Sequence, residues 1–183
     1  EGELFSDFSL LWLLAHQSRF EAPEPERCIL EQWRNAGIQN GERALADLRK
    51  GVEEAIAVLG EGFLAHRNNE SLRRALKEGE LTTQEFYQEL LRLVYRLIFL
   101  FVAEDRGALL LPDAPAEAKQ FYLDNYSTRR IRRLAEEIRG THHSDLFESL
   151  KVVMGLLHRS GSEALALPAL GSYLWSPEAA AYL

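Results

Sequence analysis

The hydrophobic and polar positions of this chain follow helical spacing from one end to the other. Apolar residues recur every three or four positions, and no segment alternates apolar and polar residues as a half-buried strand does. The pattern therefore predicts an all-α fold of about eight helices. With their caps, the expected helices cover residues 4–17, 25–37, 45–59, 68 or 69–79, 82–107, 116–125, 127 or 128–140 and 144–161.

The segment 82–112 is expected to form the central helix of the fold. Thr82 and Glu85 have the spacing of a capping box, while Gly107 and Pro112 are typical of a helix end. Helical spacing would place the polar residues of its first half in one stripe along one face. These residues are Glu85, Gln88, Glu89, Arg92 and Arg96.

The second half of this segment is apolar on every side, because residues 97–103 contain no polar residue. A helix of this kind is predicted to lie buried among its neighbours, and we expect Phe99 and Leu100 to be buried. A membrane span is excluded by length. Charged residues on both sides of the apolar run leave far fewer than the ~20 residues needed to cross a bilayer.

The chain has 183 residues, which fits one domain with a sizeable core. We expect a helical domain at residues 1–163 and an ordered arm at 164–183, where Pro168, Gly171 and Pro177 stand among large apolar residues. The chain does not begin with methionine, and its only one is Met154. We therefore expect it to be a piece of a longer protein.

The net charge of −7 argues against binding to nucleic acid through bulk charge. The single cysteine, Cys28, allows no intrachain disulfide and no cysteine-rich zinc site. The apolar run at residues 8–20 is preceded by acidic residues rather than by the positive leader of a signal peptide, so it is interpreted as a core helix. A cytoplasmic location is expected.

Most candidates for chemistry have a simpler structural interpretation. Gly60-Glu61-Gly62 follows a predicted helix rather than a strand, so a helix end is favoured over a phosphate loop. The histidines show no HExxH motif or other metal-ligand spacing. They are His16, His66, His142, His143 and His158. The acidic pairs 53–54, 104–105 and 136–137 are interpreted as solvated faces and helix ends.

The segment YSTRRIRRLAEEIR at residues 126–139 is the exception. Its five arginines and two glutamates give it a local charge of +3. Arg129 and Arg130 would lie in the first helical turn, where the helix dipole disfavours cations. Arg132 and Arg133 could pair with glutamates four residues later. An arginine that precedes its glutamate forms the weaker of the two possible helical pairs. The four arginines are candidate contacts to DNA phosphate or to an acidic surface; an arginine-rich surface helix is about equally favoured.

Five segments, taken in order, resemble the helical region of large adenine-specific DNA methyltransferases. The family comprises type IIG restriction-modification enzymes and related BREX-like phage-defence methylases. The segments are LLWLLAHQSRF, LRKGVEEAIAVLGEGFL, TTQEFYQELLRLVYRLIFLFVAEDRGALLLP, YSTRRIRRL and LPALGSYLW. The positions carried over are structural. They are Glu104, Arg106, Tyr126, Ser127, Arg130, Arg133, Pro168 and Gly171.

This resemblance implies that an S-adenosylmethionine-binding methyltransferase domain with an Asn-Pro-Pro-Tyr type motif follows the LPALG segment in the same polypeptide. No Asn-Pro-Pro occurs here, so no catalytic, cofactor-binding or metal-binding residue is assigned. The expected function is to position the catalytic domain and contact the DNA backbone. The alternative is a protein-protein docking module of a defence complex that does not touch DNA.

Overall fold

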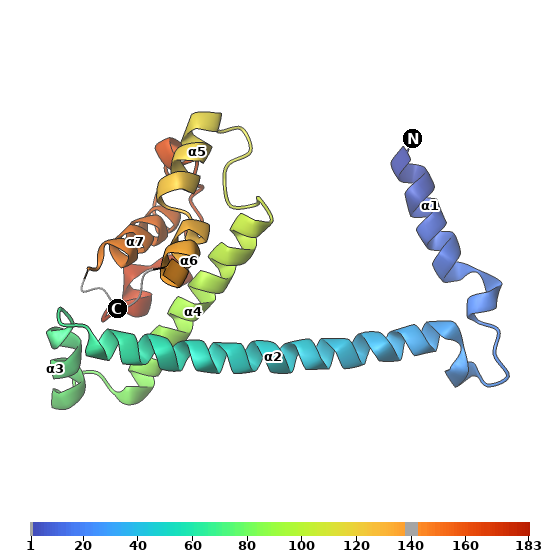
Figure 1. Cartoon of the computed structure of the whole chain (residues 1–183), viewed down its shortest axis with the longest axis horizontal. Helices are drawn as coiled ribbons and strands as arrows, with labels where there is room; N and C mark the ends of the chain where they lie inside the picture. Colours follow the sequence, from blue (N-terminus) through green and yellow to red (C-terminus); the bar gives the residue numbers. More distant parts are fainter. Residues whose placement is uncertain (1, 138–142) are drawn as a thin grey trace. The chain divides into compact units, whose positions relative to one another are not determined.

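The computed structural model describes residues 2–137 and 143–183, and within them the fold is all-α, as the hydrophobic pattern predicts (Figure 1). The described part contains seven α-helices, and five short 3-10 turns, η1–η5, punctuate it. The α-helices are α1 (Gly2–Ala15), α2 (Ile29–Ala65), α3 (Glu70–Glu78), α4 (Thr83–Asp105), α5 (Ala116–Asn125), α6 (Thr128–Glu137) and α7 (Asp145–His158). The predicted end of the seventh helix at Gly140, and His142, lie outside the described residues.

The expectation of eight helices is wrong at one place, because the predicted helices 25–37 and 45–59 form the single helix α2. Gly37 and Gly60 were expected to end helices, but both lie inside it. An interior glycine costs a helix roughly 1 kcal/mol without removing a backbone hydrogen bond, so the helix continues through it. At Gly60 the absence of a side chain also allows close packing, because a Cβ there would lie 3.2 Å from Leu90 Cδ1.

The chain divides into two compact units within α2, at Gly51 and Val52. The first unit holds α1, the turns η1 (Gln17–Arg19) and η2 (Pro25–Arg27), and residues 29–51 of α2. The prediction that its first segment is a core helix is wrong for the described residues. Seven large apolar side chains of the described residues of α1 are at least 49% exposed: Phe5, Phe8, Leu10, Leu11, Trp12, Leu13 and Leu14.

The second unit has two adjoining hydrophobic clusters joined by α4. In one, α2, α3 and α4 meet through residues such as Ile56, Leu72 and Leu90. In the other, α4 and α7 pack together with Tyr122 of α5 and Trp175 of the C-terminal arm. The central helix expected from the sequence is therefore present.

Both ends of α4 carry the signals read from the sequence. Thr82 and Glu85 form the reciprocal hydrogen bonds of a capping box. At the other end Gly107 has a positive φ of 63°, and its N–H donates to Glu104 O, while Ala108 N–H donates to Ala103 O. This pair of bonds is a Schellman motif, in which glycine adopts the left-handed conformation at no steric cost.

The expected burial around α4 is only partly correct. Leu100 is fully buried, but Phe99 is 41% exposed and touches Trp175 with its ring edge. The polar stripe deviates in the opposite direction, because two of its charged residues, Glu89 and Arg96, are buried. The cause is the C-terminal arm, which lies along this polar face and takes it out of solvent.

The arm is ordered, as predicted, and consists of turns rather than strands. It comprises η3 (Glu163–Leu165), η4 (Tyr173–Trp175) and η5 (Pro177–Ala180). Ser162 and Leu167 exchange backbone hydrogen bonds of 2.9 Å each. Gly161 is required before this bridge, because its φ is positive and a Cβ there would lie 2.4 Å from Leu167 O.

Candidate functional site

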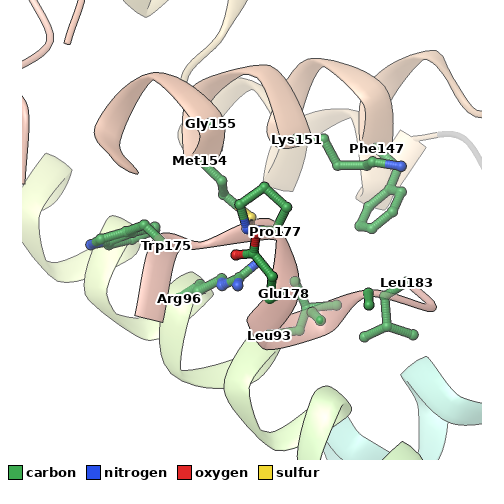
Figure 2. A pocket seen from close by; sticks show the side chains of 12 residues that line it. Leu93, Arg96, Phe147, Lys151, Met154, Gly155, Trp175, Pro177, Glu178 and Leu183 are labelled. Atoms are coloured by element: carbon green, nitrogen blue, oxygen red, sulfur yellow. Dashed lines mark hydrogen bonds between the residues drawn. The ribbon is translucent and has the colours of Figure 1, made fainter. Parts of the chain in front are cut away.

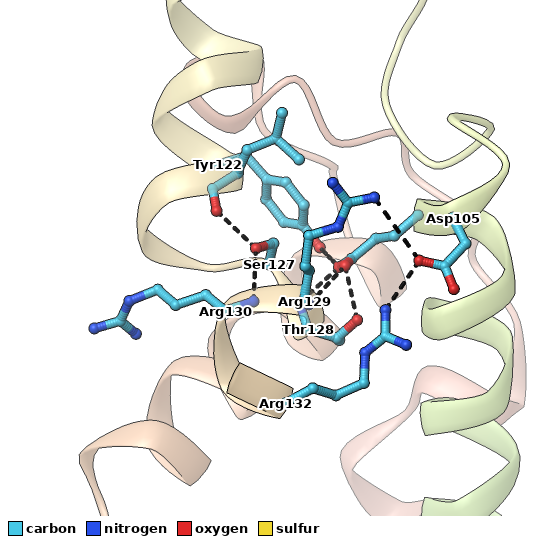
Figure 3. Close-up of polar contacts among 9 residues, drawn as sticks. Asp105, Tyr122, Ser127, Thr128, Arg129, Arg130 and Arg132 are labelled. Atoms are coloured by element: carbon cyan, nitrogen blue, oxygen red, sulfur yellow. Dashed lines mark hydrogen bonds and ion pairs between the residues drawn. The ribbon is translucent and has the colours of Figure 1, made fainter. Parts of the chain in front are cut away.

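The basic helix α6 begins with a side-chain cap from Ser127. Arg130 N–H donates to Ser127 Oγ at 3.2 Å, and this hydroxyl in turn donates to Leu123 O at 2.6 Å (Figure 3). A serine in this position satisfies one of the free N–H groups of the first turn. The sequence left the cap open between Ser127 and Thr128, and the structure assigns it to Ser127.

The remaining donors of the first turn of α6 meet the carboxylate of Glu104, at the end of α4. Thr128 N–H and Oγ1–H donate to it at 2.8 and 2.7 Å, and Arg129 N–H at 3.1 Å. Tyr122 adds its hydroxyl at 2.6 Å. Glu104 therefore places a negative charge at the N-terminus of α6, where the helix dipole favours it.

Tyr122 is fully buried, and its side chain is tied to this carboxylate. Burial raises the pKa of Tyr122 far above its usual value, and the hydrogen bond to Glu104 and its negative charge raise it further. Tyr122 is therefore a permanent donor. Because an internal carboxylate fills the start of α6, an external anion is no longer needed to explain the arginines there.

Two of the four candidate arginines turn toward Asp105, beside Glu104. Arg132 Nη2 lies 2.9 Å from Asp105 Oδ1, and its guanidinium is 4.8 Å from the centre of the Phe101 ring. Arg129 Nη2 is 3.9 Å from the same oxygen, and its side chain is 72% exposed. Arg132 thus has its carboxylate on α4, whereas the sequence placed it within α6.

The other two candidate arginines form no ion pair with α4. Arg130 points away from it in Figure 3, and its Nη1 donates a long hydrogen bond of 3.4 Å to Asn125 O. Arg133 is exposed and forms no ion pair with any residue that the structure describes. Of the sequence candidates, Arg133 is exposed, Arg130 is half-buried with one long hydrogen bond, and Arg129 is exposed with one long ion pair.

A second polar constellation, which sequence reasoning missed, fixes the arm on α4. Arg96 donates through Nε to Leu174 O at 2.5 Å and through Nη2 to Ser176 O at 2.8 Å. Glu89 accepts Ala181 N–H at 3.2 Å and Tyr182 N–H at 3.0 Å. Arg92 adds a bond to Ala179 O at 3.2 Å. We call Glu89, Arg92 and Arg96 the arm clamp.

The histidines do not form a metal site in the described part of the chain, where no three side chains of His, Cys, Asp or Glu come together. No described helix has the length and apolar content of a membrane span. Comparison with known proteins found no matching family model, no matching curated protein and no matching solved structure.

Proposed function

We propose that this chain is a noncatalytic helical part of an S-adenosylmethionine-dependent, adenine-specific DNA methyltransferase of a restriction-modification or phage-defence system. Its role is to position a catalytic domain in the same polypeptide and to add contacts to the DNA backbone. The proposal rests on the ordered resemblance of five segments. Under this proposal the chain is cytoplasmic. S-adenosylmethionine binds to the catalytic domain.

The arm clamp is the structural observation that supports a positioning role most directly. A connector has to hold the polypeptide that follows it in a fixed relation to its own core. Here side chains of α4 bind the backbone of residues 174–182 at five points. Trp175 anchors the same segment in the hydrophobic core. A catalytic domain attached after the arm would be oriented by these bonds.

The DNA-contacting role is assigned to Arg130 and Arg133, with Arg129 beside them. Exposed guanidinium groups bind phosphate without reading sequence. In the complete protein, reversing both Arg130 and Arg133 to Glu should weaken DNA binding. It should also flatten the plot of log affinity against log salt by about 0.9 for each lost contact. Titration of labelled duplex at several salt concentrations measures this slope.

Arg74→Glu provides the control, because Arg74 is an exposed arginine of α3 that pairs weakly with Glu70 at 3.5 Å. It changes the net charge by the same amount per residue but should leave the slope unchanged. An unchanged slope in the Arg130/Arg133 reversal would remove DNA contact from the proposal.

The second candidate function is a protein-protein docking module, and the exposed apolar side chains of the first unit favour it. They continue from α1 into α2, where Trp33, Ile38, Leu45 and Leu48 are 43–66% exposed. Exposed apolar surface of this extent is typical of a protein interface. Co-purification with a partner in the absence of DNA, together with DNA binding that the arginine reversal leaves unchanged, would select this candidate.

A further inference from the structure

A cavity of about 400 Å³ lies between α4, α7 and the arm, within the second unit (Figure 2). This volume is within the range of small-molecule sites. Its walls are mostly apolar and include Leu93, Phe147, Met154 and Trp175. Figure 2 shows Arg96 on the α4 side and Gly155 on the α7 side.

Arg96 gives this apolar cavity a cationic wall. The residue is only 5% exposed, yet no carboxylate of a described residue lies within ion-pair distance of it. Buried charges in proteins are normally paired, because removing an ion from water is costly. The partners of Arg96 are two carbonyl oxygens and, at 3.6 Å, the sulfur of Met154.

The guanidinium group has five N–H donors, and these three bonds use one each. One N–H therefore remains on each terminal nitrogen, Nη1 and Nη2. A carboxylate can accept both in the two-pronged geometry that arginine forms with carboxylates. A carboxylate head group therefore matches the number of donors that remain.

The other charged side chains of the cavity belong to Lys151 and Glu178, which are more exposed than Arg96. Lys151 is half exposed, pairs with Glu148 at 3.6 Å and lies over the Phe147 ring. Glu178 of the arm also lines the cavity and forms no ion pair with Arg96. Arg96 is the buried charge among these lining side chains, and its cationic head favours an anionic group of a ligand beside it.

We propose that this cavity binds a small amphipathic carboxylate, with its head group on Arg96 and its apolar body against Leu93, Phe147 and Met154. The site is separate from the basic helix and does not depend on the DNA-related function proposed above. Arg96 also binds the backbone of the arm. A carboxylate bound to Arg96 would therefore stabilise the arm clamp further.

Octanoate and its neutral analogue octanamide are suitable probes, since they share an apolar chain and differ in the charge of the head group. Calorimetric titration of the 183-residue chain should give a dissociation constant for octanoate that is roughly tenfold or more below that of octanamide, as expected for a charged hydrogen-bonded pair. Equal affinities, or no octanoate binding, would overturn the proposal.

Gly155→Leu provides a blocking variant that keeps the arm clamp intact. Gly155 lines the cavity, and a Cβ built on it meets no atom within 4 Å. Leucine is also a better helix former than glycine, so the variant should fold. It should lose octanoate binding, whereas Gly62→Leu, on an open position of α2 outside this cavity, should retain it. Full octanoate binding by Gly155→Leu would place the ligand elsewhere and contradict the assignment.

Discussion

At the scale of single residues, the polar side chains of α4 have roles that their local pattern conceals. Glu89 and Arg96 belong to a stripe with the spacing of a solvated helix face, and charged residues are seldom buried without a partner. Their backbone partners lie 78–93 residues later in the sequence. No local pattern contains that information, so the stripe was predictable but its burial was not.

Glu104 gives the sharpest test of a residue's role at the α4–α6 junction. Glu104→Ala leaves the buried hydroxyl of Tyr122 and the first N–H groups of α6 without their acceptor. Unfolding free energy in urea melts should fall by about 2–3 kcal/mol. The neighbouring Asp105→Ala removes only exposed ion pairs and should cost less than about 1 kcal/mol. Similar losses in the two variants would mean that Glu104 is an ordinary surface carboxylate.

Glu89 should make stability depend on pH. Burial raises the pKa of Glu89 above its ordinary value of 4.5, although the bonds from Tyr182 and Ala181 and the charges of Arg92 and Arg96 oppose the shift. A carboxyl with a raised pKa binds more protons in the folded than in the unfolded state. Its contribution to stability therefore decreases as pH rises from about 4.5 through the folded-state pKa.

The measurement compares the wild-type chain with Glu89→Gln, a variant that cannot titrate at this position. The difference in unfolding free energy, wild type minus variant, should fall with rising pH across this window and level off above it. A difference that instead grows with pH would show that the backbone bonds to the charged form outweigh burial.

At the scale of elements, local signals predicted helix ends well where they act through the backbone itself. The capping box at Thr82 and Glu85 and the left-handed Gly107 were both recognised in the sequence and both occur. Glycines inside α2 misled the prediction because a glycine weakens a helix in every context but ends it only when the chain turns there. Packing explains the glycine at Gly60, which lies against Leu90, but not the one at Gly37, where a Cβ would meet nothing within 4 Å.

Substitution by alanine should change the unfolding free energy differently at two glycines of α2. A Cβ at Gly51 meets nothing within 4 Å, so Gly51→Ala should raise the unfolding free energy by about 0.5–1 kcal/mol through helix propensity. At Gly60 the Cβ would lie 3.2 Å from Leu90 Cδ1, which offsets that gain. Thermal melts followed by circular dichroism measure both. Equal stabilisation by the two substitutions would mean that Gly60 has no packing role.

At the scale of the whole molecule, helical periodicity was sufficient to establish the all-α class. It was not sufficient to locate the division at Gly51 and Val52, because the boundary lies inside a continuous helix without a proline or a polar linker. Nor could it show that α1 is exposed, since an apolar helix in a core and one that awaits a partner have the same sequence pattern.

Adenine methylation by the complete protein that carries these 183 residues tests the proposed function most directly. The measurement is genome-wide mapping of N6-methyladenine, by single-molecule sequencing, in cells with and without the gene. The account predicts that adenine in one recognition sequence is methylated only in cells with the gene, and that deleting residues 172–183 from the protein abolishes this methylation. Identical adenine methylation in cells with and without the gene would contradict it.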